Sequence, residues 1–178
     1  MLRDQFDHVL RAAAGVLGES ELLVIGSQAI HAAVRGAPFD EAQRSVEVDL
    51  VPLEDQDGIK ADLIDGSIGE ASMFHETFGV YGQGVGVATA VLPQGWRDRL
   101  LRYDEPASGV VAWCLEPNDL WVSKAIAGRP KDREFCAALL ERGLVDPDVL
   151  RDRVTKAERA TDAQRHRAES WIDRTSDS

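Results

Sequence analysis

The chain has 178 residues, 44% of them hydrophobic and 29% charged, which is the composition of a folded globular protein and excludes a disordered chain. This length predicts one domain, or one domain with a small helical appendage. The 31 Asp and Glu against 20 Lys and Arg give a net charge of −11. Non-specific binding to nucleic acid is therefore disfavoured, because phosphate contacts need basic side chains. A local basic patch can still bind RNA, while a small-molecule substrate or a basic partner suits the charge at least as well.

No targeting or membrane-spanning segment is predicted. The first ten residues, MLRDQFDHVL, carry charges where a signal peptide needs an apolar stretch, and no apolar run approaches 18 residues. Cys114 and Cys136 fall in a predicted strand and a predicted helix, at a separation that matches no metal-binding pattern. We therefore expect two buried thiols and a cytoplasmic protein that contacts no membrane.

The first third of the chain predicts a helix and two strands. Apolar residues recur at helical spacing over residues 2–17, and Gly18 ends that helix. Residues 22–25 are a short apolar strand that runs into a Gly-Ser turn and a helical stretch over 28–34. Residues 45–52, with the sequence SVEVDLVP, alternate apolar and polar side chains, as a half-buried strand does.

The middle of the chain is less regular. Segment 36–45 is expected to be a polar connection, and apolar spacing from Ile59 predicts a short helix that ends at Gly66. Residues 66–90 contain many glycines and no clear period, so they are either strands broken by turns or a mobile loop over a site. A further strand is expected within residues 97–103.

The last third predicts one strand and then helices. Residues 110–115 form the strand, and helices follow over 118–127, 131–142 and 146–154, each opened by Pro or closed by Gly. From about residue 155 the chain is polar, which predicts a solvated terminal helix with a frayed end and one isolated tryptophan, Trp171.

This order of elements predicts an α+β fold. A small mixed sheet flanked by helices would be followed by a helical C-terminal part packed on it. The expected division is a core of residues 1–116 and a helical part of residues 117–178.

Two acids on the strand of residues 45–52 are the first candidate for chemistry. Glu47 and Asp49 are two residues apart, so they share one face at a separation of about 7 Å. Their mutual repulsion has to be relieved by a cation or by solvent. Oxygen ligands of this kind suit Mg²⁺ or Mn²⁺, and the alternative is the wet face of an edge strand.

The turn at Gly26-Ser27 is the second candidate. Its backbone N–H groups and the Ser27 hydroxyl are suited to hold a phosphate, whereas the plainer interpretation is a strand-to-helix turn with Ser27 as the N-cap. Lys124 is the third candidate, because apolar neighbours surround it and a cation near a core must find an anion. That anion is a triphosphate or the Asp132 carboxylate, unless the lysine simply reaches solvent.

Together these motifs resemble a known superfamily. The Gly-Ser turn, the ExD strand and the later stretch PNDLWVSKAIAGRPKDREF look like the nucleotidyltransferase-like superfamily with the polymerase-beta-type minimal fold. More closely, the chain resembles small bacterial nucleotidyltransferase-like proteins related to the AbiEii and MenT toxins. The resemblance covers roughly residues 20–143.

The resemblance implies a role for each matching residue. Gly26 and Ser27 would contact nucleotide phosphate, Glu47 and Asp49 would bind Mg²⁺ or Mn²⁺, and Lys124 and Asp132 would bind phosphate and complete the active site. The superfamily pattern is usually Asp-x-Asp, so Glu47 departs from it by one methylene. A third carboxylate of the superfamily is not identifiable, and the candidates for it are Asp104, Glu105 and Glu116.

The resemblance also implies an enzyme that moves a nucleoside monophosphate from an NTP to an acceptor hydroxyl. The acceptor would be tRNA if the protein is the toxin of a toxin–antitoxin pair, which also implies a cognate antitoxin. The alternatives are the same chemistry on a small molecule or protein, or a non-catalytic nucleotide-binding protein.

Two smaller features stay open. The pair His75-Glu76 is either catalytic or idle, and two arginine-rich clusters are either an RNA surface or ordinary solvated charges. Those clusters are Arg97, Arg99 and Arg102, and Arg129, Lys131 and Arg133.

Overall fold

The computed structural model describes residues 1–176, which form two compact units. Unit 1 comprises Met1–Thr89 and Leu100–Leu115 and contains the sheet. Unit 2 comprises Ala90–Arg99 and the chain from Glu116 onward, and it is helical. The fold is the predicted mixture of a sheet flanked by helices and a helical C-terminal part.

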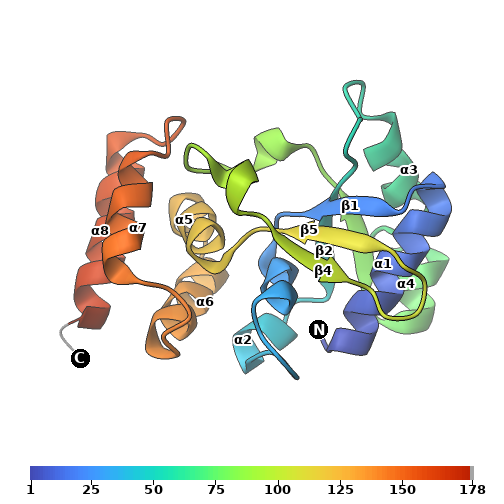
Figure 1. Ribbon diagram of the computed structural model, residues 1–178, viewed down its shortest axis with the longest axis horizontal. Coiled ribbons are helices and arrows are strands. Elements are labelled where there is room, and N and C mark those ends of the chain that lie inside the picture. The colour runs from blue at the N-terminus through green and yellow to red at the C-terminus, as the bar shows by residue number, and fades with distance from the viewer. Residues whose placement is uncertain (177–178) are drawn as a thin grey trace. The chain divides into compact units, whose positions relative to one another are not determined.

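The sheet of unit 1 has five strands in the order β3-β2-β1-β5-β4 (Figure 1). The pairs β1–β5 and β2–β3 are parallel, whereas β1–β2 and β4–β5 are antiparallel, so the predicted mixed sheet is confirmed. The strands are β1 Glu21–Val24, β2 Glu47–Val51, β3 Tyr81–Gly84, β4 Leu101–Asp104 and β5 Val111–Cys114.

Two helices cover one face of this sheet. A Cβ atom built on Gly82 of β3 would meet Ile68 of α3 at 2.8 Å and Val9 of α1 at 3.2 Å, so both helices lie on the side that Gly82 faces. The other helices of unit 1 are short. Unit 1 contains α1 Arg3–Leu17, α2 Asp40–Gln43, α3 Ile59–Ile68, α4 Met73–Phe78 and the 3₁₀ helices η1 Ser27–Ala32 and η2 Val87–Thr89.

Strand alternation then fixes where the acids of β2 point. Val48 and Leu50 are fully buried, and Leu50 lies beside Gly82 under α1 and α3. Glu47 and Asp49 therefore point to the opposite face, and both are partly exposed. The predicted placement of the two acids on one face of a strand is confirmed.

Unit 2 contains four α-helices, most of which have clear start or stop residues in the sequence. Proline opens three of them, and the left-handed residue Gly128, with φ of 71°, ends the first. These helices match the predicted ones within a residue or two. They are α5 Pro117–Ala127, α6 Pro130–Glu141, α7 Pro147–Thr155 and α8 Asp162–Ser176, and the short 3₁₀ helix η3 Trp96–Arg99 also belongs to this unit.

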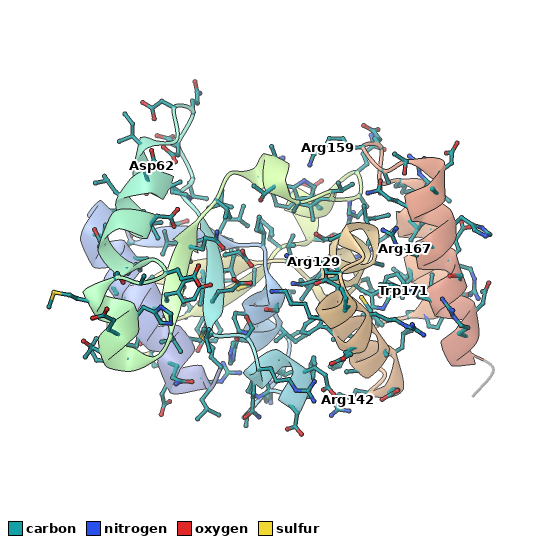
Figure 2. All side chains as sticks on the ribbon, turned by 180° about the vertical axis from the view of Figure 1, so that it is seen from behind. Asp62, Arg129, Arg142, Arg159, Arg167 and Trp171 are labelled. Carbon is teal, nitrogen blue, oxygen red and sulfur yellow. The ribbon has the colours of Figure 1, made fainter. Side chains whose placement is uncertain are left out.

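The expected terminal helix is present as α8, but one side of it is buried rather than solvated. Ala168 and Ile172 of α8 are fully buried, and α8 packs on α5 and α7. Arg167, labelled in Figure 2, donates to the carbonyl of Ile126 at 2.6 Å. Gln164 donates to the same carbonyl at 3.3 Å. Side chains of α8 thus satisfy carbonyls at the end of α5 that lack partners within their own helix. The expected frayed end falls partly beyond Ser176, outside the described residues.

The glycine-rich segment 66–90 is ordered rather than a loop, and it contains α4 and β3. Ser72 caps α4 by accepting a hydrogen bond from the backbone of His75, and Gly79 ends the helix in the left-handed region. In β3 the glycines make room: a Cβ at Gly84 would lie 2.1 Å from the carbonyl oxygen of Ala61 in α3. Composition therefore does not indicate this strand, because its glycines are there to let helices pack closely and are not typical strand residues.

Two further expectations concern short segments and thiols. The helical stretch at 28–34 is the 3₁₀ helix η1, and the polar connection at 36–45 contains the single-turn helix α2. Both cysteines are buried and free, as predicted. None of the helices in the described part of the chain is long and apolar enough to cross a membrane.

Candidate functional site

The Gly-Ser turn and the second acid of β2 lie against each other in unit 1. The backbone N–H of Ile25 donates to the carbonyl of Asp49 at 3.2 Å, which extends the β1–β2 pairing to the edge of the turn. A Cβ atom on Gly26 would lie 1.6 Å from the Asp49 Oδ2 atom. Since φ of Gly26 is −91°, glycine is required for space and not for backbone conformation. Because Gly26 has no side chain, the Asp49 carboxylate can lie against the turn, and we call this arrangement the cradle.

Ser27 follows immediately and is buried, with 7% of its surface exposed. It is the first residue of η1, and Gly26 occupies the N-cap position. The plainer prediction of Ser27 as the N-cap is therefore wrong by one residue. Its position beside Gly26 still puts the Ser27 residue next to Asp49 at the end of β1.

Glu47 is held by a tyrosine of the neighbouring strand. Tyr81 stands beside Glu47 in the parallel β2–β3 register, and its hydroxyl donates to Glu47 Oε2 at 3.0 Å. Burial, the bond to Glu47 and then the negative charges of Glu47, Glu70 and Asp49 raise the pKa of Tyr81 to about 12. The hydroxyl therefore stays protonated, and it remains a donor, across the physiological pH range.

The two acids fit a hard divalent cation. Glu47 and Asp49 are carboxylates on one partly exposed face, and the Asp49 carboxylate lies against Gly26 of the turn. Within residues 1–176 no group of three or more His, Cys, Asp or Glu is placed to hold a metal ion. Such a cation would thus depend on few protein ligands, with substrate phosphate and water supplying the rest, which is how Mg²⁺ is commonly bound.

Two of the candidates for a third carboxylate, Asp104 and Glu105, lie on or directly after a strand away from the two acids. Asp104 lies on β4, three strands from β2 and hence about 14 Å away across the sheet, and it pairs with Arg102. Glu105 follows on the same edge, where it accepts hydrogen bonds from Arg11 and Ser108. Glu116 belongs to unit 2 and caps α5. The acid whose charge does reach Tyr81 is Glu70, which sequence reasoning did not single out.

In unit 2, Lys124 and Asp132 form an ion pair with each other. The Lys124 Nζ atom lies 3.5 Å from Asp132 Oδ1, and the two residues are 8% and 1% exposed. Asp132 also accepts a hydrogen bond from Arg129 Nε at 2.7 Å and one from the Arg129 backbone at 3.2 Å. Of the two anions considered for Lys124, the structure supplies the Asp132 carboxylate, at the corner where α5 turns into α6.

A second buried carboxylate of unit 2 escaped sequence reasoning. Asp119 is fully buried, and it accepts two hydrogen bonds from Arg99, at 2.9 and 3.0 Å, and a third from Arg153 at 3.0 Å. Burial raises the pKa of Asp119, and the bonds from Arg99 oppose that rise. Burial and the charge of Arg99 lower the pKa of Arg153 to about 10. Asp119 is buried because of how the helices pack, and the residues next to it in the sequence do not indicate that packing.

This network corrects part of the arginine prediction. Arg99 is committed to Asp119, Arg102 to Asp104 and Arg129 to Asp132, so three of the six basic residues predicted as an RNA surface are in ion pairs. A structural role explains Arg99, whose partner is fully buried, whereas the side chains of Arg102 and Arg129 are 55% and 53% exposed, as solvated charges are.

His75 lies close to the site but holds backbone groups. Its Nδ1 atom accepts a hydrogen bond from the backbone N–H of Ala71 at 3.1 Å, and its ring packs on Tyr81 with centroids 4.7 Å apart. The rings of His8 and His31 pack on phenylalanine rings.

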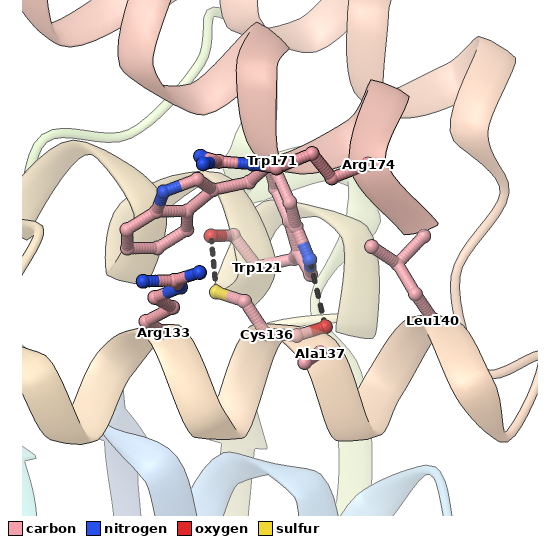
Figure 3. A pocket seen from close by; sticks show the side chains of 7 residues that line it. All are labelled: Trp121, Arg133, Cys136, Ala137, Leu140, Trp171 and Arg174. Carbon is pink, nitrogen blue, oxygen red and sulfur yellow. Dashed lines mark hydrogen bonds between the residues drawn. The ribbon is translucent and has the colours of Figure 1, made fainter. Parts of the chain in front are cut away.

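A pocket of about 110 Å³ lies between α6 and α8 of unit 2 (Figure 3). The indole of Trp121 forms its floor and donates to the carbonyl of Cys136 at 3.1 Å. Trp171 therefore belongs to a packed helix pair and is not an isolated surface residue. The pocket is lined by Trp121, Arg133, Cys136, Ala137, Leu140, Trp171 and Arg174.

Comparison with known proteins gives one match. A family model described as "Nucleotidyltransferase of unknown function (DUF6036)" matches residues 5–172, which include both units. None of the curated proteins and none of the solved structures matches the chain. The family match supports the resemblance to the nucleotidyltransferase-like superfamily drawn from the Gly-Ser turn and the two acids of β2. The chain belongs to this family of nucleotidyltransferases of unknown function.

Proposed function

We propose that the protein transfers a nucleoside monophosphate from an NTP to an acceptor hydroxyl, at the cradle formed by Gly26, Ser27, Glu47 and Asp49. The observation that carries this proposal is the contact between Gly26 and Asp49. A glycine whose missing side chain makes room for a strand carboxylate brings a metal-binding oxygen against a turn whose backbone N–H groups suit a phosphate.

The reaction joins the acceptor oxygen to the α-phosphorus of the NTP. The bond between that phosphorus and the bridging oxygen to the β-phosphate breaks, pyrophosphate leaves, and the proton of the acceptor hydroxyl passes to water. A divalent cation held by Glu47 and Asp49, Mg²⁺ or Mn²⁺, would neutralise phosphate charge. Catalysis in such a site consists largely of positioning and electrostatics.

Each residue of the cradle has a separate part. The backbone and hydroxyl at Ser27 would orient one phosphate, and the absence of a side chain at Gly26 lets the Asp49 carboxylate lie against the turn that would hold that phosphate. Lys124 would counter charge on the leaving pyrophosphate and Asp132 would hold Lys124, as the ion pair between them allows. The roles of Lys124 and Asp132 rest on the resemblance alone.

The acceptor divides the proposal into two candidates. A tRNA acceptor, with a cognate antitoxin as partner, follows from the resemblance to the AbiEii and MenT toxins. A small molecule or a protein side chain is favoured by the charge distribution: unit 1 holds only six of the 20 basic residues, while it holds 17 of the 31 acids. A cradle in so acidic a unit repels an RNA backbone unless the acceptor is bound elsewhere.

The test uses the purified chain with each of the four NTPs, labelled in turn at the α- and the γ-phosphate. Total RNA, a protein extract and a small-molecule extract serve as acceptors in separate reactions with Mg²⁺. The proposal expects the α-label, and not the γ-label, to appear in one acceptor class. Transfer of the γ-label would show phosphoryl transfer and contradict the proposal. NTP binding without transfer to any acceptor would favour a non-catalytic nucleotide-binding protein.

A further inference from the structure

Strand β3 places a tyrosine, Tyr81, beside Glu47 on the face that carries the two acids. Tyr81 is 8% exposed, and its hydroxyl donates to Glu47 at 3.0 Å. Its backbone N–H donates to the carbonyl of Val46 at 2.9 Å, which fixes the register of β3 against β2. The hydroxyl thus reaches Glu47 from a strand whose register against β2 is fixed.

A strained turn supports the tyrosine from behind. Ala71 has φ of 61°, and it is the one residue other than glycine with positive φ in the described part of the chain. That conformation costs an L-residue energy and tends to persist where the surroundings enforce it, often at functional sites. Ala71 uses it to aim its N–H at His75 Nδ1, and the His75 ring packs against Tyr81 at 4.7 Å.

These contacts form one chain from Ala71 through His75 and Tyr81 to Glu47. We infer that Tyr81, backed by His75, is a positioning residue that holds the Glu47 carboxyl group where it can bind the cation next to Asp49. The inference rests on the proposed function, because it needs that cation. It also accounts for the extra methylene of Glu47: a longer side chain with more freedom gains most from a fixed hydrogen-bond donor.

The protein itself offers a matched control. Its other tyrosine, Tyr103 of β4, is also 8% exposed and also donates its hydroxyl to a carboxylate, that of Asp7. Tyr103 lies at the far edge of the sheet from Glu47. Loss of either hydroxyl removes one hydrogen bond to an acid, so a general effect of that loss would be common to Tyr81→Phe and Tyr103→Phe.

The experiment measures Mn²⁺ binding directly, by electron paramagnetic resonance of the free ion, without a substrate. Tyr81→Phe is expected to weaken Mn²⁺ binding about tenfold, as loss of a partner of a metal ligand usually does, while Tyr103→Phe leaves it unchanged. In the Glu47→Gln background Tyr81→Phe should have no further effect. Circular dichroism and thermal unfolding check that each variant is folded.

A second variant covers the case in which Tyr81→Phe does not fold. Glu47→Asp withdraws the carboxylate from the Tyr81 hydroxyl by one methylene and should weaken Mn²⁺ binding to a similar extent. Unchanged Mn²⁺ affinity in Tyr81→Phe, or in Glu47→Asp if that variant must be used, overturns the inference but leaves the proposed function standing if Asp49→Ala still weakens binding. Unchanged affinity in both Asp49→Ala and Glu47→Gln overturns both.

Discussion

Replacement of Gly26 by alanine tests the cradle at its narrowest point. The new Cβ would lie 1.6 Å from Asp49 Oδ2 and 2.6 Å from its Cγ, so the carboxylate has to rotate away. The backbone itself tolerates alanine, because φ of −91° is an ordinary value. Forcing a methyl group into a filled space typically costs about 1–3 kcal/mol, and we expect Gly26→Ala to lower the free energy of unfolding by that amount.

The cost should depend on Asp49. In an Asp49→Ala background only the Cβ of residue 49 remains, at 3.0 Å, which a shift of a few tenths of an ångström relieves. Gly26→Ala should then cost less than about 1 kcal/mol, so urea denaturation of the four chains gives a coupling energy of about 1–2 kcal/mol. Nucleotidyl transfer by Gly26→Ala should fall as far as in Asp49→Ala.

Gly66 supplies the matched control for this cycle. It lies in α3 with no atom within 4 Å of an added Cβ, so Gly66→Ala should stabilise the helix by up to about 1 kcal/mol and leave transfer unchanged. An equal cost of Gly26→Ala with and without the Asp49 carboxylate would refute the reasoning, because the clash would then lie elsewhere.

Three further predictions concern buried charges. Asp132→Ala should lower the free energy of unfolding by about 3 kcal/mol in urea denaturation, because it leaves Lys124 buried without its anion; an unchanged value would contradict that. Arg99→Gln should destabilise the fold by about 2 kcal/mol through Asp119 yet leave RNA affinity in a gel-shift assay unaltered, and the reverse result would restore Arg99 to an RNA surface. Burial, with the charge of Arg3 adding to it, lowers the pKa of His31 to about 3, so the folded chain cannot take the proton that the unfolded chain binds below pH 6.5. Stability should therefore fall as the pH drops from 6.5 towards 3, by up to about 1.4 kcal/mol per pH unit, and His31→Phe should flatten that slope in denaturation series across this range.

Sequence patterns predict the elements whose causes are local. Alternation along β2, helical spacing along α1, and the Pro and Gly boundaries of α5 to α7 each act within a few residues, and all are confirmed. For residues 66–90 the sequence leaves strands or a mobile loop open, because the reason for the glycines of β3 is the close approach of α3, more than a dozen residues earlier in the chain. The polar tail is misread for a similar reason: α8 buries only Ala168 and Ile172 among its apolar residues, and Arg167 and Gln164 bond to a carbonyl of α5.

The candidate site divides in the same way. Residue types and spacing single out Gly26, Glu47 and Asp49, but the contact between Gly26 and Asp49 depends on how β1 pairs with β2. The support of Glu47 by Tyr81 depends on a register between residues 34 positions apart. Such pairings are set by the whole sheet, so a local pattern cannot reveal them.

Transfer of an α-labelled nucleoside monophosphate by Asp49→Ala, measured beside the wild-type chain and the Gly66→Ala control, tests the central claim most directly. The wild type and Gly66→Ala should label the same acceptor at equal rates, and Asp49→Ala should lose labelling while its circular dichroism spectrum shows a folded chain. Labelling by Asp49→Ala at the wild-type rate would contradict the account, since the carboxylate in the Gly26 cradle would then have no part in the reaction.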